Sequence, residues 1–245
     1  MLQALKNIFG PSSSELPRLE TDIHSHLIPG IDDGSKSMDE SIAMIRTFSD
    51  LGYKKLITTP HIMKHRYPNT EESILEGLEA VQKAVAEAKI DMVIEAASEY
   101  YLDEHVMELV EKKEILTFGE NYMLFEFSYV QAPHHLEEMI FEIKVAGYKP
   151  VLAHPERYVF MHSDFSKYES LKAKGVLFQM NIPSLGGYYS PAVAKVAKKI
   201  VAAGMVDFLG SDCHKDRHLG ALQKVRQSRE YAKVFVNNTI LNHQL

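Results

Sequence analysis

The sequence predicts an α/β fold in which seven parallel strands close into a barrel. Short apolar runs alternate with longer helical patterns from about residue 18 onward, and seven of these runs have the length of strands. Strands that alternate with helices pair in parallel through βαβ units, which build both closed barrels and open doubly wound sheets. Seven strands favour the barrel, although this order of elements also fits an open sheet.

The predicted strands are short runs rich in β-branched and other apolar residues. They are Leu19–Ile23, Lys55–Thr59, Met92–Ala96, Tyr122–Phe127, Pro150–Ala153, Val176–Met180 and Val206–Leu209. Helical patterns follow four of them, over Met38–Leu51, Glu71–Ala88, Leu136–Ala146 and Pro191–Ala203. Terminal residues support these helices, because Thr70 and Ser190 are suited to N-caps and Gly147 and Gly204 stand where helices end.

Composition favours a single globular domain over residues 18–245, preceded by a leader of residues 1–17. The 245 residues are 45% hydrophobic and 24% charged, which is ordinary for a globular protein with a sizeable core. Residues 10–17 are rich in glycine, proline and serine, as is typical of a flexible segment. No later segment has the composition of a linker, and we find no internal repeat.

Charge and cysteine content restrict the partners and the location. The 27 basic and 33 acidic residues give a net charge of −6, which argues against a nucleic-acid partner. The single cysteine, Cys213, excludes a disulfide framework and fits a reducing compartment. The N-terminus lacks the apolar region of a signal peptide, and no stretch approaches the about 20 apolar residues of a membrane span. We therefore expect a cytoplasmic protein without a transmembrane segment.

Six of the seven predicted strands deliver a metal-competent side chain at or near the carboxyl end. In a parallel barrel these ends meet on one face, where the active sites of such folds lie. The side chains are His24, His26, His61, Glu99, Glu126, His154, Asp212 and His214. Chance explains one or two such placements, whereas six indicate a shared metal site at the carboxyl ends of the strands.

Spacing within the strands supports the same site. His24 and His26 are two residues apart, as are Asp212 and His214, so each pair points to one side of its strand. Either pair alone is weak evidence. Glu126 lies in an apolar run between two phenylalanines, where an unpaired carboxylate is costly to bury and metal coordination is one remedy.

The number of donors indicates more than one ion. Asp33, in an Asp-Asp-Gly turn after the first strand, is the ninth candidate, although such a sequence is often only a turn. Five imidazoles and four carboxylates exceed the about four to six ligands of one ion, so they suit two or three divalent ions. Nitrogen and oxygen donors without thiolate indicate zinc, manganese or iron. Cys213 is expected to face away, because it stands between two candidate ligands.

Charge also indicates an anionic substrate. Three divalent ions outweigh four carboxylates, so the pocket would be positive. Metal-bound water has a pKa near ~7, which gives hydroxide as a nucleophile, and neighbouring ions can clamp a phosphoryl group. Arg157 and Arg217 each follow a candidate histidine by three residues and are candidates to bind phosphate; the alternative for each is an arginine in a surface ion pair.

These motifs resemble those of the PHP (polymerase and histidinol phosphatase) superfamily, and most closely the bacterial protein-tyrosine phosphatases of capsule and exopolysaccharide operons. The resemblance covers about residues 20–240. The motifs that carry it are Asp22-Ile23-His24-Ser25-His26, Asp32-Asp33-Gly34, Thr59-Pro60-His61, Glu99, Leu124-Phe125-Glu126-Phe127, Ala153-His154-Pro155-Glu156-Arg157, Ser211-Asp212 and His214.

The resemblance implies a distorted (β/α)7 barrel with three metal ions, manganese being favoured. It assigns His24, His26, Glu99 and Asp212 to one ion, Asp33, His61 and His214 to a second, and Glu126 and His154 to a third, with Glu99 bridging. It also implies that Arg157, and Arg217 with it, binds the phosphate. Attack by metal-bound hydroxide without a phosphoenzyme is implied, and the chain agrees, because a Cys-x5-Arg loop starting at Cys213 would need arginine where Leu219 stands.

Three functions follow from this reasoning. The first is a protein-tyrosine phosphatase that acts on a tyrosine kinase of polysaccharide export and thereby regulates capsule synthesis. The second is a small-molecule phosphatase of the histidinol-phosphate type, which would use nearly the same ligands. The third is a scaffold that has lost catalysis, against which stands the presence of every expected ligand. A nuclease is disfavoured by the net charge of −6.

Overall fold

The computed structural model describes residues 18–245, so the proposed leader of residues 1–17 lies outside the described residues. Within this range, parallel strands form a three-stranded sheet in the order β1-β2-β4 and a six-stranded sheet in the order β3-β5-β6-β7-β8-β9. The strands are β1 (Thr21–Asp22), β2 (Lys55–Thr58), β3 (His61–Ile62), β4 (Val93–Ala96), β5 (Glu99–Tyr101), β6 (Tyr122–Glu126), β7 (Lys149–Ala153), β8 (Leu177–Asn181) and β9 (Phe208–Gly210).

The two sheets are continuous along the chain. β2 leads into β3 after two residues, and β4 leads into β5 in the same way, so these two predicted strands each continue from one sheet into the other. Beyond β1 and β9, Ser25 and Cys213 form an isolated parallel bridge. The predicted α/β fold with parallel strands is confirmed, whereas closure into a barrel stays a prediction.

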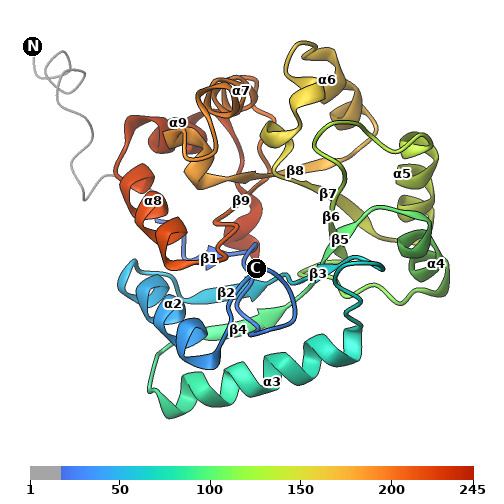
Figure 1. The fold of residues 1–245 in the computed structure, drawn as a ribbon. Coiled ribbons are helices and arrows are strands. Elements are labelled where there is room, and N and C mark those ends of the chain that lie inside the picture. Colours follow the sequence, from blue (N-terminus) through green and yellow to red (C-terminus); the bar gives the residue numbers. More distant parts are fainter. Residues whose placement is uncertain (1–17) are drawn as a thin grey trace, which may run out of the picture.

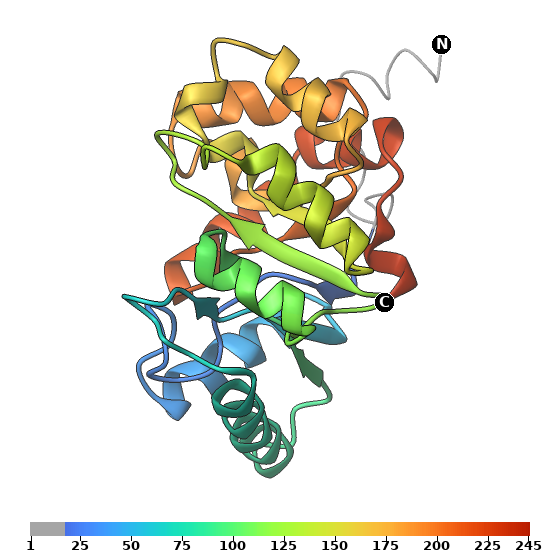
Figure 2. The ribbon, with the colours of Figure 1, turned by 90° about the vertical axis from the view of Figure 1, so that its right-hand side faces the viewer.

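Helices surround the sheets (Figure 1), and a view turned by 90° shows α3 at the end opposite α6 and α7 (Figure 2). The helices are α2 (Met38–Asp50), α3 (Glu71–Glu87), α4 (Glu104–Lys112), α5 (Leu136–Val145), α6 (Ser166–Ala173), α7 (Pro191–Ala202), α8 (Asp216–Arg226) and α9 (Arg229–Asn237), with short 3-10 turns η1 (Pro155–Arg157), η2 (Val159–Met161), η3 (Ile182–Gly186) and η4 (Leu241–Gln244). Among residues 18–245, no helix is long and apolar enough to cross a membrane.

Local signals set the ends of the predicted helices. The Thr70 hydroxyl accepts a hydrogen bond from the backbone of Ser73, and Ser73 returns one to the backbone of Thr70, which is a capping box at the start of α3. At the start of α7 the Ser190 hydroxyl accepts a hydrogen bond from the backbone of Val193, and Pro191 follows as the first residue of the helix. Gly147, just past α5, has a φ of +97°, which only glycine adopts without strain.

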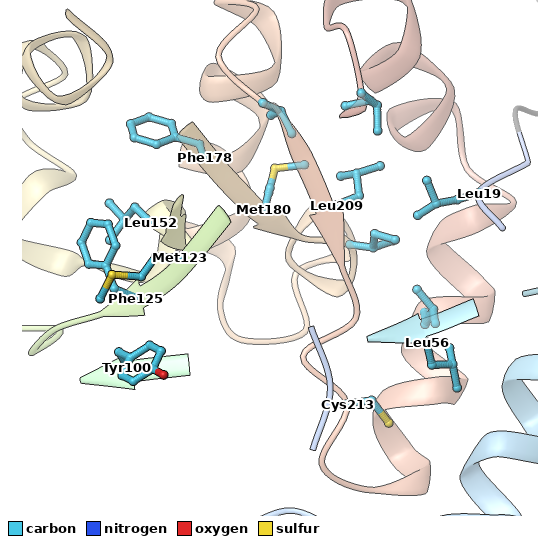
Figure 3. Close-up of a cluster of buried hydrophobic side chains, with 14 of the residues drawn as sticks. Leu19, Leu56, Tyr100, Met123, Phe125, Leu152, Phe178, Met180, Leu209 and Cys213 are labelled. Atoms are coloured by element: carbon cyan, nitrogen blue, oxygen red, sulfur yellow. The ribbon is translucent and has the colours of Figure 1, made fainter. Parts of the chain in front are cut away.

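The strands separate an outer core from an inner one. Met123 and Phe125 of β6 pack with Phe178 and Leu209 in the larger core between the strands and the helices (Figure 3). Leu124 faces the other way, into a smaller cluster with Ile23, Ile57, Val151 and Phe208. Residues two apart on a strand share a face, so Glu126 extends this inner face beyond Leu124.

Cys213 belongs to the outer core and not to the inner face. Its side chain is fully buried, and its sulfur lies 3.8 Å from the sulfur of Met44 on α2. Asp212 and His214 on either side of it point to the inner face instead. The alternation of strand residues therefore excludes the thiol from the site, as the sequence predicted.

Candidate metal centre

The nine predicted donors come together in one cluster, near the carboxyl ends of β1, β2, β4, β6, β7 and β9. Glu99, at the start of β5, lies among the histidines and is 1% exposed. Its Oε2 is 3.1 Å from His24 Nε2 and 3.2 Å from His61 Nδ1, and its Oε1 is 2.9 Å from His154 Nε2. One carboxylate thus contacts imidazoles that follow three different strands, which is the arrangement expected of a bridging ligand.

Asp33 gathers a second set of donors at the mouth of the site. Its Oδ1 is 3.4 Å from Nε2 of His61 and 3.4 Å from Nε2 of His214. The ring of His214 stacks on that of His26 with centroids 3.8 Å apart. The Asp-Asp-Gly turn therefore places Asp33, the ninth candidate, among the other donors, although such a sequence is often only a turn.

Asp212 and Glu126 complete the cluster. Asp212 Oδ1 is 3.6 Å from His24 Nε2 and 3.7 Å from His26 Nε2. Glu126 Oε1 is 3.4 Å from His61 Nδ1. The donors form four overlapping groups in which the ligand atoms lie within 4.8 Å of one another, namely His26, Asp33, His61 and His214; His24, Glu99 and His154; His24, His26 and Asp212; and His61, Glu99 and Glu126.

Strained backbone presents two of these donors. His154, directly after β7, has a φ of +35°, and Asp212, shortly after β9, has a φ of +51°. Residues other than glycine adopt this left-handed region at a cost of about 1–3 kcal/mol, and they cluster at functional sites. Burial and hydrogen bonds hold both residues in place, since the backbone N–H groups of His154 and Asp212 donate to Gln179 Oε1 and His24 O.

The orientation of the histidines fits metal ions. His24 Nδ1 lies 2.7 Å from Gln179 Oε1, an acceptor that also receives the backbone N–H of His154, so Nδ1 carries the proton. His26 Nδ1 lies 2.7 Å from the Asp32 carboxylate and must likewise donate. Both rings therefore turn the Nε2 lone pair into the cluster, as metal-binding histidines do.

Several buried donor atoms have no other use among the described residues. His26 Nε2, His61 Nδ1 and Asp33 Oδ1 make no hydrogen bond within residues 18–245. A buried polar atom without a partner costs about 1–3 kcal/mol. Cations among these atoms would satisfy all three, so the residues fit the divalent ions that the sequence implied. The identity and the number of the ions stay predictions.

Electrostatics points the same way. Burial alone would raise the pKa of Glu99, but the nearby imidazoles outweigh it and hold that pKa well below its usual range. Burial, with the charge of Glu99, raises the pKa of Glu126 to about 8. Burial lowers the pKa of His24, yet the charges of Glu99 and Asp212 raise it to about 9. Nearby positive charge thus stabilises the buried carboxylates. Metal ions would supply this charge and would displace the protons of the imidazoles.

Arg157 lies beside the donors, held between two tyrosine rings. Its Nη1 donates to Asp212 Oδ2 at 2.8 Å. Its guanidinium carbon is 4.6 Å from the ring centroid of Tyr129 and 4.4 Å from that of Tyr189. Contact on both faces fixes the plane of the guanidinium group. The side chain remains 22% exposed, so its free N–H groups can reach a ligand.

Polar side chains of β8 support the centre from behind, although the sequence predicted this strand without a site residue. β8 was the one predicted strand without a candidate, yet Gln179 holds His24 and Asn181 Nδ2 donates to Asp212 Oδ2 at 2.7 Å. Asp32 was also passed over in favour of Asp33. A signal was present for β8, because Gln179 and Asn181 are buried polar residues two apart in an apolar run.

A cavity of about 750 Å³ opens above the donors. Its wall is rich in aromatic side chains, namely Tyr67, Tyr101, Phe127, Tyr129, Tyr188 and Tyr189. Arg217 lines this cavity, as do His65 and His218, but its exposed side chain has no hydrogen bond or ion pair within residues 18–245. Arg157 is therefore part of the built site, whereas Arg217 stands at its mouth.

Tyr189→Phe is expected to lower kcat/KM for phosphate-ester hydrolysis, the reaction that the sequence motifs imply, by about tenfold. The loss of a hydrogen-bond partner that orients a metal ligand costs about 10–100-fold in activity. The Tyr189 hydroxyl donates to Asp212 Oδ2 at 3.0 Å and accepts from Asn181. Phenylalanine keeps the ring over Arg157 but removes this hydrogen bond. Steady-state kinetics measures the change, and Tyr188→Phe is the matched control, because the Tyr188 hydroxyl has no hydrogen-bond partner among the described residues. Equal rates for both variants would contradict the role of the Tyr189 hydroxyl.

Known proteins share the sequence and the fold. The family model described as capsular polysaccharide synthesis, CpsB/CapC, matches residues 20–238. The tyrosine-protein phosphatase YwqE of Bacillus subtilis (strain 168) is 28% identical over 194 residues, which cover 79% of this chain and 76% of YwqE. The tyrosine-protein phosphatase CpsB of Streptococcus pneumoniae is 31% identical over 199 residues, which cover 79% of this chain and 82% of CpsB.

Solved structures agree with these relatives. A chain from the crystal structures of YwqE and CpsB, described as metal-dependent tyrosine phosphatases, has a TM-score of 0.78 and 26% identity, covering 90% of this chain and 96% of that one. An amidohydrolase from Mycoplasma synoviae has a TM-score of 0.50 at 14% identity, a likeness that concerns the fold alone. Because the family model spans nearly the whole chain, this protein belongs to the CpsB/CapC family of capsular polysaccharide synthesis.

Proposed function

We propose that this chain is a metal-dependent protein-tyrosine phosphatase that acts on tyrosine-phosphorylated proteins. The named relatives of its family are tyrosine phosphatases, which supports the reaction and disfavours the small-molecule alternative of the histidinol-phosphate type. The family description supports a role in capsular polysaccharide synthesis. A tyrosine kinase of polysaccharide export is the partner that we infer from this role.

One observation carries the proposal: an aromatic-walled cavity ends on the donor cluster, with Arg157 beside it. An aryl phosphate fits this order of groups, because its ring would meet aromatic walls while its phosphate reaches the cationic end. Aromatic pairs contribute about 0.5–1.5 kcal/mol beyond the burial of their area. The phenol of tyrosine has a pKa of about 10, so the leaving group needs less protonation than an alkoxide.

The ligands that we propose are the nine donors, with Glu99 as the bridging carboxylate. Bound divalent ions act as Lewis acids and make water a nucleophile at neutral pH. Residues of the chain itself would position the metal ligands and the phosphate. Gln179 and Asp32 fix the rings of His24 and His26, and Arg157 would bind phosphoryl oxygens through its remaining N–H groups. Arg217, from the mouth, would add a second contact.

We also infer that the two sheets form a distorted seven-stranded barrel within a single domain of residues 18–245. The direct passage from β2 to β3 and from β4 to β5 supports this, as does the bridge between Ser25 and Cys213. In such a barrel, the aliphatic and aromatic residues of the inner face would fill the half at the amino ends of the strands. The donors would then occupy the carboxyl-end face.

A substrate panel tests the function. We expect the manganese-loaded protein to hydrolyse a tyrosine-phosphorylated peptide with a kcat/KM about 100-fold above that for histidinol phosphate, a factor in reach of pocket complementarity. Phosphate release is the measurement, with and without a chelator. A panel in which histidinol phosphate is the better substrate would overturn the proposal, and so would an inactive protein with full metal loading.

A further inference from the structure

Two exposed cations line the cavity mouth in addition to Arg217. Arg66 lies in the loop between β3 and α3, and Lys215 lies just before α8; both line the cavity and both are exposed. Neither has an ion-pair partner within residues 18–245. We call this pair the basic rim. It is separate from the nine donors and from Arg157.

The rim residues are brought together by the metal centre below them. Arg66 lies 5.0 Å over the ring of Tyr67, which in turn stacks on His61. Lys215 directly follows His214, and His61 and His214 both approach Asp33 Oδ1 at 3.4 Å. The segment between β3 and α3 and the segment between β9 and α8 therefore meet at the Asp33 carboxylate. This meeting also places Arg66 and Lys215 at the same cavity.

The part of the lining that follows β5 and β6 has a different charge. There the lining residues are Asp103, Ser128 and Tyr129, and the Asp103 carboxylate is fixed as the N-cap of α4 by the backbone N–H of Val106. The chain as a whole carries a net charge of −6, so its net field repels anions. The basic rim is thus a local exception, beside the place where a phosphate would enter.

From this polarity we infer that the protein selects phosphotyrosine segments that carry a further anionic group beside the phosphotyrosine. The inference rests on the proposed function, because it places the phosphate on the donor cluster and the neighbouring anion on the basic rim. A carboxylate side chain and a second phosphate share the chemistry that Arg66 and Lys215 recognise. Exposed ion pairs are weak singly, so the rim adds selectivity while the donor cluster supplies most of the affinity.

Binding of non-hydrolysable peptides tests the rim without relying on catalysis. Three phosphonate analogues of a phosphotyrosine peptide are compared by fluorescence anisotropy: one flanked by glutamates, one by a second phosphotyrosine, and one by alanines. We expect the first two to bind the manganese-loaded protein about tenfold more tightly than the third, a difference that shrinks as salt rises. The arm with the larger gain identifies the anion that the rim prefers.

The double variant Arg66→Ala/Lys215→Ala is expected to bind all three peptides with the affinity of the alanine peptide, and to leave the hydrolysis of free phosphotyrosine unchanged. Lys64→Ala is the matched control, because Lys64 is exposed on the same loop but is not among the described residues that line the cavity. Equal binding of the three peptides by the unaltered protein would overturn the inference, even if all are hydrolysed. A charge preference without hydrolysis would instead leave the rim standing and remove the phosphatase.

Discussion

A Glu99→Gln substitution is expected to lower phosphotyrosine hydrolysis about 10³-fold, the scale of a lost electrostatic group at a reacting centre. Glutamine keeps the shape of the side chain but removes its charge. The carboxylate lies 2.9 Å from His154, 3.1 Å from His24 and 3.2 Å from His61, so it serves more than one group of donors. Losing it would weaken the whole cluster, and we expect the activity of the variant to match that of chelator-treated protein.

Thermal unfolding measures the same loss without catalysis. Ions that bind only the folded protein stabilise it by about 2.7 kcal/mol when present at 100 times their dissociation constant. Manganese should therefore raise the Tm of the unaltered protein and raise that of Glu99→Gln much less. Glu95→Gln is the control on β4, because Glu95 is a half-exposed carboxylate paired with Lys55. A Glu99→Gln protein with normal manganese content and activity within tenfold would exclude Glu99 as a ligand.

The strand pattern explains how far the sequence could anticipate the site. Alternation along a strand is a local property, and it sufficed to point His24 with His26 one way and Cys213 the other. Glu126 was conspicuous because a carboxylate between two phenylalanines is costly to bury. The helices α4, α6, α8 and α9 were not predicted. In α6, for example, only Tyr168 and Leu171 are buried, too few to reveal a helical period.

Other features depend on contacts that sequence spacing does not contain. Asp32 and Asp33 are neighbours in one turn, yet Asp32 is buried against His26 while the Asp33 side chain, 46% exposed, reaches His61 and His214. Only the turn geometry assigns them different tasks. The tyrosines on either side of Arg157 come from loops 28 residues before it and 32 after it. No local pattern links residues so far apart in the chain.

Arg157→Lys is expected to lower kcat/KM for phosphotyrosine peptide about 10²-fold, and Arg157→Ala about 10³-fold, as for arginines that stabilise phosphoryl transfer. Lysine keeps the charge but offers neither two parallel N–H donors nor a plane that fits between Tyr129 and Tyr189. The metal centre should survive, because Asp212 Oδ2 still accepts hydrogen bonds from Asn181 and Tyr189. Weaker inhibition of these variants by inorganic phosphate would show that the lowered kcat/KM comes from a lost contact with the phosphate group.

Two measurements, the manganese-dependent rise in Tm and inhibition by inorganic phosphate, together show whether Arg157 binds phosphate or serves only a structural role. If Arg157 binds phosphate, both variants keep the manganese-dependent rise in Tm while phosphate inhibition weakens. If Arg157 serves only to orient Asp212, with which it forms the 2.8 Å ion pair, the rise in Tm is lost and phosphate inhibition of the metal-loaded protein is unchanged. Arg217→Ala provides the comparison at the cavity mouth. The Arg217 side chain is exposed and has no hydrogen bond or ion pair among the described residues, so its loss is expected to lower kcat/KM less than tenfold.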